Sequence, residues 1–274
     1  MDKLKIVFVN FPTLSASQVA GCFKQRPTNY FHVIPLGIVH LAAVLENEKF
    51  VNSVECLDYC VELENASDYE SYETFIDTVA AKINYKPDIL AYSINFSTQH
   101  DFFVRCEKQL RKKWPQSIAI VGGTHATNAT REIFHLSSVD YLVRGEAETS
   151  LPQLVKLIND EKLDEIGSVK GVYSRKSITK EKTLDISEYP NLSELPIPAW
   201  HIFEMDRYTH NDDSKQGEGE RLVEVQGTNK IRGECSIMTS RGCPFHCTFC
   251  SSFSVHGREM RYFSIEWTKR MCKD

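Results

Sequence analysis

Five short apolar runs alternate with amphipathic segments over the first 160 residues, and this alternation constrains the fold more than any other feature. The first run, KIVFVNF (5–11), is rich in β-branched and aromatic residues, as a strand buried on both faces of a sheet requires. Strands are expected at 5–11, 53–59, 87–95, 117–123 and 139–145, and helices at 35–50, 69–83, 99–114, 129–136 and 148–160. This pattern predicts an α/β fold with a doubly wound, parallel, five-stranded sheet.

The residues that follow the strands are the candidates for a binding site. In doubly wound sheets, ligands bind beyond the carboxyl ends of the strands, where the strand order reverses. Those ends carry Asn10 and Phe11, then 93–96, 122–125 and 144–148. No GxGxxG follows the first strand and no GxxxxGK[ST] occurs, so neither a dinucleotide nor a P-loop site is supported. The glycines of VGGTH suit a plain turn or a close ligand, and the carboxylates of RGEAE suit a helix N-terminus.

Composition narrows the functional class. The 274 residues carry a net charge of −5, with 42% hydrophobic and 25% charged residues. Such a chain can bury sizeable cores, and its acidic balance gives no electrostatic case for nucleic acid. The longest apolar stretch, 34–45, is too short to span a bilayer, and the N-terminus does not resemble a secretion signal. We therefore expect a cytoplasmic protein, whose nine cysteines favour a metal or iron–sulfur site over disulfides.

Residues 161–232 are expected to form a hairpin and a linker between a domain at 1–160 and a second one at 233–274. The segment GVYSRKSITKEKT (171–183) has two strand-like runs around a polar turn, which predicts the hairpin. Three prolines in DISEYPNLSELPIPAWHIF (185–203) indicate an extended connection, anchored by Trp200 and Phe203.

Three cysteines stand close together in RGCPFHCTFCSS, at Cys243, Cys247 and Cys250. Residues 234–240 form an expected strand before them, so the loop would lie at the carboxyl end of a strand, where α/β barrels carry their chemistry. A structural zinc site needs a fourth ligand and usually two spaced pairs. Of the candidates for that ligand, His246 sits inside the loop and would strain a four-ligand cage, and the others show no pairing pattern: Cys235, His256 and Cys272. Three thiolates with one open position suit a catalytic iron–sulfur cluster better.

This spacing resembles the Cys-x3-Cys-x-Phe-Cys signature of the radical S-adenosylmethionine (SAM) superfamily, including Phe249 before the last cysteine. PLGIVHLAAVLE, IAIVGGTHAT, VDYLVRGEAET, LPIPAWHIF and MRYFS resemble, in the same order, the cobalamin-binding members. That group includes the hopanoid methylases and the anaerobic magnesium-protoporphyrin ester cyclase. The resemblance covers nearly the whole chain. It implies a flavodoxin-like, cobalamin-binding domain, then the first strand and cluster loop of an incomplete (β/α) radical SAM barrel.

The resemblance also assigns roles to individual residues. Cys243, Cys247 and Cys250 would ligate a 4Fe–4S cluster whose fourth iron binds SAM, and Phe249 would pack beside the cluster and the adenine of SAM. Residues implied for cobalamin are Ser93, Gly122, Gly123 and His125 near its nucleotide tail, and Gly145 and Glu146 near the corrin edge. The Asp-x-His-x-x-Gly motif of many cobalamin proteins is absent after the first strand, so no axial histidine is expected from that loop.

The implied activity is reductive cleavage of SAM to a 5′-deoxyadenosyl radical, for methylation or cyclisation of an unactivated carbon. The substrate would be a small molecule or peptide, and flavodoxin or ferredoxin would donate the electron. A full barrel takes roughly 250 residues, whereas 233–274 would hold only its beginning, ending in a helix capped by Ser264. A truncated, inactive cobalamin-binding module is therefore the alternative.

A third interpretation is a methylthiotransferase-like protein, in which three cysteines of the first domain would bind a second cluster. The candidates are Cys22, Cys56, Cys60 and Cys106, which the sequence indicates are ordinary buried thiols.

Overall fold

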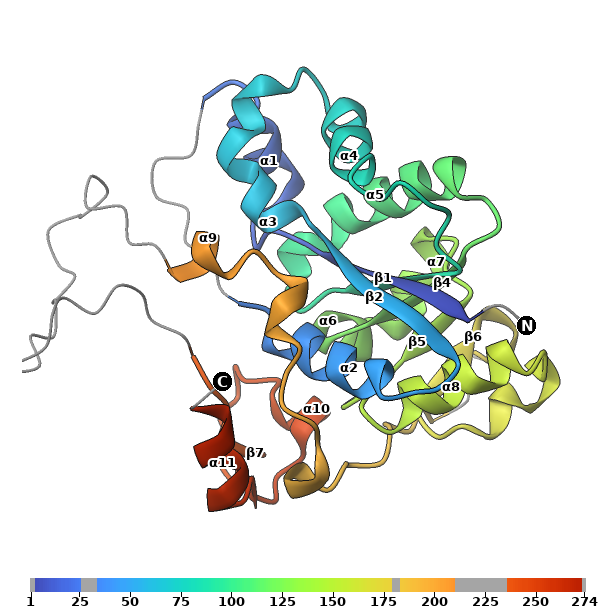
Figure 1. Cartoon of the computed structure of the whole chain (residues 1–274), viewed down its shortest axis with the longest axis vertical. Helices are drawn as coiled ribbons and strands as arrows, with labels where there is room; N and C mark the ends of the chain where they lie inside the picture. The colour runs from blue at the N-terminus through green and yellow to red at the C-terminus, as the bar shows by residue number, and fades with distance from the viewer. Residues whose placement is uncertain (1–2, 26–33, 179–182, 210–235, 273–274) are drawn as a thin grey trace, which may run out of the picture.

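A computed structural model describes residues 3–25, 34–178, 183–209 and 236–272 of the chain (Figure 1). Its centre is a six-stranded sheet in the order β2-β1-β3-β4-β5-β6. The first five strands pair in parallel and β6 runs antiparallel to β5. The strands are β1 (Leu4–Asn10), β2 (Val51–Asp58), β3 (Ile89–Ser93), β4 (Ile118–Gly122), β5 (Tyr141–Val143) and β6 (Val172–Ser174). The predicted parallel, doubly wound sheet is confirmed.

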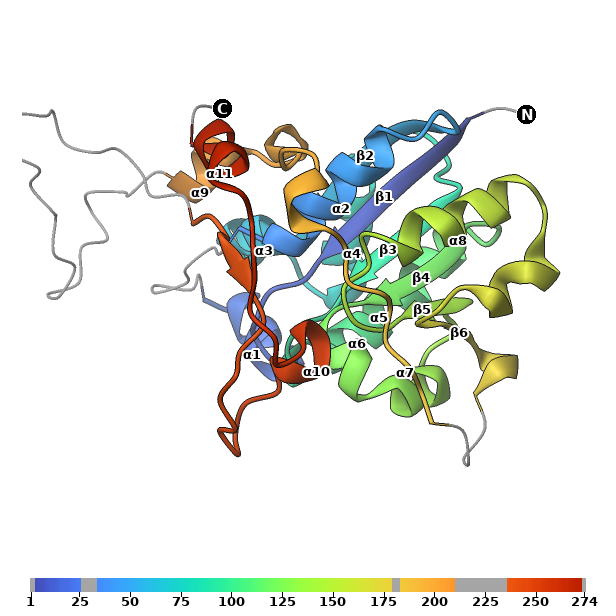
Figure 2. The same ribbon diagram turned by 90° about the horizontal axis from the view of Figure 1, so that it is seen from below.

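Helices cover both faces of this sheet. Helices α2 and α8 pack on one face, and α1, α4, α5 and α7 pack on the other (Figures 1 and 2). The helices of this part are α1 (Ala16–Cys22), α2 (Leu36–Glu46), α3 (Tyr59–Glu62), α4 (Tyr72–Ala80), α5 (His100–Lys113), α6 (Thr124–Asn128), α7 (Thr130–Leu136) and α8 (Ser150–Asn159). The helix side changes between the neighbouring strands β1 and β3, which marks the switch in strand order where doubly wound proteins bind ligands.

Strand β1 shows why its sequence is apolar at nearly every position. Ile6 and Phe8 point to the face covered by α2 and α8, while Val7 and Val9 point to the opposite face. None of the four is more than 2% exposed. A strand with helices on both sides needs such a run, because neither of its faces meets water.

The C-terminal segment, residues 236–272, lies against α2 and α6 (Figure 2). Its two short strands, β7 (Ser240–Arg241) and β8 (Arg261–Tyr262), pair antiparallel and flank the cysteine loop and α10 (Phe253–His256). Helix α11 (Ile265–Met271) begins at Ser264, whose side chain accepts a hydrogen bond from the Trp267 backbone N–H, as predicted. Trp267 is 2% exposed and its indole N–H donates to the Leu195 carbonyl at 2.6 Å.

Two local expectations need correction. The segment 171–183 was expected to form a hairpin. Residues 172–174 instead pair with β5 and extend the main sheet as β6. Residues 179–182 of this segment lie outside the described residues. The strand expected at 234–240 is assigned only at Ser240, continuing to Arg241, while residues 234 and 235 lie outside the described residues. The sequence analysis also overlooked α1, which starts with a capping box between Ser15 and Gln18.

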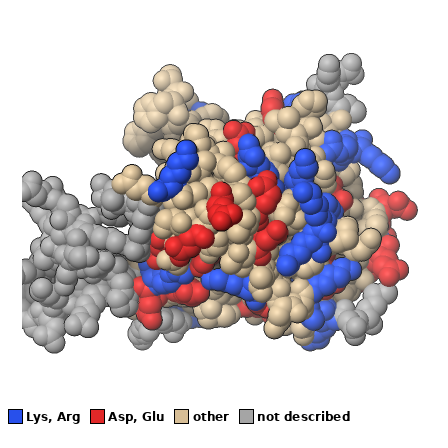
Figure 3. All heavy atoms as spheres, turned by 90° about the horizontal axis from the view of Figure 1, so that it is seen from above, with Lys and Arg blue, Asp and Glu red and all other residues tan. Residues whose placement is uncertain are grey.

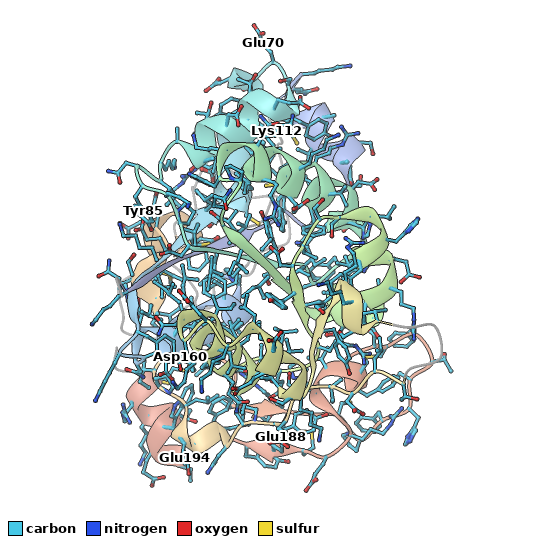
Figure 4. The ribbon with its side chains drawn as sticks, turned by 90° about the vertical axis from the view of Figure 1, so that its right-hand side faces the viewer. Glu70, Tyr85, Lys112, Asp160, Glu188 and Glu194 are labelled. Carbon is cyan, nitrogen blue, oxygen red and sulfur yellow. The ribbon has the colours of Figure 1, made fainter. Side chains whose placement is uncertain are left out.

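The connection between the two parts includes α9 (Met205–Thr209) and passes along α2, where the Ala199 backbone N–H donates to the Val39 carbonyl. Figure 4 shows Glu188 and Glu194 in this connection, beside the C-terminal segment, and Asp160 just past the end of α8. On the face seen in Figure 3, acidic and basic side chains are interspersed. Among the described residues, no helix combines the length and hydropathy needed to cross a membrane.

Candidate functional site

A crevice opens at the carboxyl ends of β3, β4 and β5, between the sheet and α2. Its volume is about 190 Å³. Its floor is apolar and comes from one face of the sheet: Phe8, Ala91, Ile120 and Val143. Five of the six residues expected to bind cobalamin line this crevice: Ser93, Gly122, Gly123, Gly145 and Glu146. The fold therefore gathers residues from three separate strand ends into one concave surface.

Gly123 is required by the backbone at the mouth of this crevice. Its φ of +103° is a conformation that side chains rarely adopt, and a Cβ there would lie 2.4 Å from the Ile94 carbonyl oxygen. The next residue, Thr124, donates its backbone N–H to the side-chain oxygen of Asn95 at 3.1 Å. The glycine thus allows the loops after β3 and β4 to meet closely, whether or not a ligand is bound.

His125 is placed differently from the other expected residues, because it does not belong to the crevice lining. It lies at the start of α6, where its Nε2 is 3.0 Å from Nδ1 of His100. Burial and, next, the neighbouring His100 lower the pKa of His125. The two imidazoles contact each other outside the crevice lining.

His40 lines the crevice from α2, and the sequence analysis assigned it no role. Its side chain is 1% exposed, and neither ring nitrogen has a hydrogen-bond partner among the described residues. Burial and, next, the charge of Arg241 lower its pKa to about 4, so the imidazole is neutral near pH 7. The signal in the sequence was a single histidine in the otherwise apolar PLGIVHLAAVLE.

Glu146 joins the crevice to the C-terminal segment. One of its oxygens accepts a hydrogen bond from Arg241 at 2.9 Å and the other lies 2.7 Å from Nδ1 of His256. Arg261 also donates to this carboxylate, at 3.2 Å for its longer contact. The second carboxylate of RGEAE, Glu148, pairs with Arg241 at 2.6 Å. The two carboxylates therefore bind cations rather than serve the N-terminus of α8.

The network keeps Glu146 ionised. Burial raises the pKa of Glu146, but hydrogen bonds from His256 and Arg261 and the charge of Arg241 outweigh it and lower the pKa to about 2. The three partners of Glu146 stand 95, 110 and 115 residues away in the sequence. Nothing local in the sequence marks such pairs, which is why the sequence analysis placed Glu146 only at the corrin edge.

The cysteine loop connects β7 to α10 and is largely exposed. Cys247 is exposed, Cys243 and Cys250 are half-buried, and none of the three forms a disulfide. Hydrogen bonding with Ser252 lowers the pKa of the Cys250 thiol. Phe249 is 91% exposed on the same loop. Gly242 has a φ of +96°, and a Cβ there would lie 2.0 Å from the Glu259 carbonyl oxygen, so the loop enters its turn beside β8.

The thiols of this loop suit an iron–sulfur cluster by their chemistry. In the described part of the chain, no three His, Cys, Asp or Glu side chains stand close enough to hold a single metal ion. Thiolates around a 4Fe–4S cluster each bind a different iron, so they lie farther apart than the ligands of one ion. Three uncommitted thiols on an accessible loop fit the cluster, and they do not form a preassembled zinc cage.

The remaining described cysteines of the first domain do not form a second cluster site. Cys22, Cys60 and Cys106 are buried, and Cys60 donates its thiol to the Phe11 carbonyl at 3.1 Å. Burial raises the pKa of the Cys56 and Cys106 thiols, which keeps them protonated. They are ordinary core thiols, as the sequence indicated.

A doubly wound sheet with a crevice at its carboxyl edge defines a ligand-binding α/β domain, and comparison with known proteins specifies which one. Residues 28–155 match the B12 binding domain family. An uncharacterized methyltransferase of Pyrococcus horikoshii is 28% identical over 273 residues, which cover 97% of this chain and 49% of the relative. The hopanoid C-3 methylase of Methylococcus capsulatus is 26% identical over 196 residues, covering 71% of this chain and 33% of the relative.

A solved structure supports the fold. TsrM, a radical S-adenosylmethionine methyltransferase from Kitasatospora setae solved with cobalamin and a [4Fe-4S] cluster bound, superposes with a TM-score of 0.59. The identity is 14%, over 99% of this chain and 45% of TsrM. This chain spans about half the length, or less, of the proteins it matches. Residues 28–155 thus match a B12 binding domain, and the chain is related in sequence to the cobalamin-dependent radical SAM methyltransferases and cyclases.

Proposed function

We propose that this chain holds cobalamin with its nucleotide tail in the crevice between the sheet and α2 and its corrin ring near Gly145 and Glu146. The proposal is supported by the apolar floor, by the lining that Gly122 and Gly145 contribute at two strand ends, and by the position of the crevice at the switch in strand order. Ser93 supplies a hydroxyl at the rim. His125 is expected to act on the cofactor only through the loops it supports, because it pairs with His100 outside the lining.

We further propose that Cys243, Cys247 and Cys250 ligate a 4Fe–4S cluster that binds SAM, with Phe249 packing against the cluster and the adenine. When bound, these groups supply electron transfer to SAM and cobalt-based methyl transfer, for methylation or cyclisation of an unactivated carbon. The chain's own residues would position these groups and exclude water from them. Exposed Phe249 and Phe245 offer apolar surface to cover the reacting groups from water.

One observation carries this proposal: both ends of the cysteine loop are tied to a residue that lines the crevice. Arg241, two residues before Cys243, and His256, six residues after Cys250, both bind the Glu146 carboxylate. The side chains of Arg241 and Glu146 are 4% and 1% exposed, so water screens their attraction little. A loop fixed at both ends over the crevice would hold the two cofactors in a constant relation, which reaction between them requires.

Anaerobic reconstitution tests the proposal. The chain is treated with iron and sulfide, mixed with SAM and either dithionite or reduced flavodoxin, and assayed for 5′-deoxyadenosine; cobalamin binding is read from the visible spectrum. Wild type should bind both groups. Cys247→Ala should lose the cluster and keep cobalamin, while the control Cys272→Ala, which alters an exposed cysteine outside the loop, should keep both. A cluster that survives Cys247→Ala would contradict the assignment of the ligands.

A second candidate function is cobalamin binding without turnover by these 274 residues alone. It is favoured by the small size of the sheet that follows the crevice, in which β7 and β8 have two residues each. Cobalamin binding and cluster assembly without 5′-deoxyadenosine would support this candidate. No cobalamin binding would refute both candidates.

A further inference from the structure

His40 is the one crevice residue in the described chain whose polar side-chain atoms are fully buried and lack any hydrogen bond. It sits in the second turn of α2, and its ring stacks against Trp267 at 5.9 Å and against Phe263 at 5.9 Å. These contacts fix the plane of the imidazole but satisfy neither nitrogen. A buried donor and acceptor without partners destabilise a protein, so such groups persist where something else supplies the partner.

The surroundings of His40 favour a neutral polar group as its hydrogen-bond partner. The imidazole is neutral near pH 7 because burial and the positive charge of Arg241 lower its pKa. It therefore carries one N–H donor and one nitrogen acceptor. Arg241 is already paired with Glu146 and Glu148, which line the same crevice, so this wall carries no uncompensated positive charge. A hydroxyl group, which can both donate and accept, therefore suits the imidazole.

The crevice also selects a narrow ligand. A space of about 190 Å³ is smaller than the pockets that enclose drug-sized ligands, but its apolar floor suits a flat aromatic base whose polar links stay at the mouth. The nucleotide tail of cobalamin has this shape, with a benzimidazole base, a ribose and a phosphate. The base would cover the floor of Phe8, Ala91 and Ile120 and leave the ribose and phosphate to face the polar wall.

We propose that His40 hydrogen-bonds to the ribose–phosphate portion of the cobalamin nucleotide tail. The inference rests on the proposed binding of cobalamin and deepens it by naming a residue that binds the nucleotide tail. His40 would act as a binding residue and not as a ligand of cobalt. The wall of α2, rather than a loop after β1, would then provide the histidine contact to the cofactor.

Cobinamide provides the test, because it keeps the corrin ring and lacks the ribose, phosphate and base. Affinities of the full chain for cobalamin and cobinamide are measured by visible absorbance, for wild type, His40→Phe and His40→Asn. The control is His201→Phe, which alters an exposed histidine paired with Glu46, outside the crevice lining. We expect His40→Phe to weaken cobalamin about tenfold, the value of one hydrogen bond, and to leave cobinamide unchanged. His40→Asn should recover part of the loss and His201→Phe should change neither affinity.

The outcomes separate this inference from the function on which it rests. An equal loss for both ligands, or no loss, would overturn it while cobalamin binding stands. Nitrogen hyperfine splitting from a ¹⁵N-histidine-labelled chain in the electron paramagnetic resonance spectrum of the cob(II)alamin form would show cobalt ligation and overturn it too. If wild type binds neither ligand, the proposed function fails and the inference with it.

A measurement without any cofactor checks the premise. Replacing the unsatisfied imidazole with a phenyl ring should raise the thermal midpoint of the cofactor-free chain, because no buried nitrogen then lacks a partner. Lower midpoints for both His40→Phe and His40→Leu would mean that the imidazole is already satisfied inside the protein, which would contradict the proposal.

Discussion

Replacing Arg241 with leucine removes the cation that two buried carboxylates share. The guanidinium lies 2.9 Å from Glu146 and 2.6 Å from Glu148, whose side chains are 1% and 5% exposed. Glu146 keeps His256 and Arg261 after the substitution. Glu148 has no other cationic partner within 4 Å in the described part of the chain, so the variant leaves it charged and buried.

The structure sets the expected size of this effect. Leaving one partner of a buried ion pair uncompensated costs about 3–5 kcal/mol. Arg241→Leu should therefore lower the free energy of unfolding by about that amount, seen as a lower urea midpoint at an unchanged slope. Adding Glu148→Leu removes the uncompensated charge and should recover most of the loss, with a coupling energy of about 2 kcal/mol or more in the double-mutant cycle. Hydrogen exchange should show the greatest loss of protection in residues 236–272, because Arg241 attaches that segment to the sheet.

A surface pair supplies the matched control. Lys156 and Asp160 lie 2.6 Å apart, but their side chains are 59% and 30% exposed, so solvent screens the pair and Lys156→Leu should change the urea midpoint little. If Arg241→Leu costs as little as the control, or if its effect and that of Glu148→Leu simply add, the network does not hold the segment in place and the reasoning is wrong.

Further predictions follow from Glu146 and Gly123. The folded state lowers the pKa of Glu146 from 4.5 to about 2, which corresponds to about 3 kcal/mol of stability. This stability is present above pH 4.5 and is lost as the pH falls toward 2. Glu146→Gln should abolish this pH-dependent component in urea titrations at successive pH values, and an unchanged acid dependence would contradict the assignment. Gly123→Ala should destabilise the chain by about 2 kcal/mol, because of the positive φ at this position and the contact of a Cβ with the Ile94 carbonyl. Gly21→Ala is the control: it has open space around it in α1 and should be neutral or slightly stabilising. Equal thermal midpoints for the two variants would refute the backbone argument.

The sheet could be predicted because its information is local. The apolar run around Phe8, and its counterparts in the next four strands, differ from amphipathic helices by their period, which is visible in any short window. The sixth strand could not be predicted, because Val172–Ser174 is short and its pairing partner β5 lies 30 residues earlier. A three-residue segment becomes a strand of the main sheet only by pairing with the edge strand, and its residue pattern alone is equally compatible with a hairpin.

Part of the candidate site could likewise be predicted from the sequence, and part depends on the tertiary structure. The sequence pointed to Ser93, Gly122 and Gly145 because ligand positions in doubly wound sheets follow from strand ends, and the structure gathers these residues in one crevice. It pointed to the three cysteines by their spacing alone. The structure places His125 against His100 and outside the crevice lining, a position that depends on the turn at Gly123.

The sequence by itself determined the class of fold, the edge of the sheet that binds and the cysteine loop, because each depends on residues close together along the chain. Only the tertiary structure decided that Glu146 joins the crevice to that loop and that His40 faces the crevice with both nitrogens free of partners among the described residues. Those relations depend on ion pairs and stacking between residues 95 or more positions apart. Such contacts form only after the helices pack, since attraction between buried charges requires the exclusion of water that packing brings.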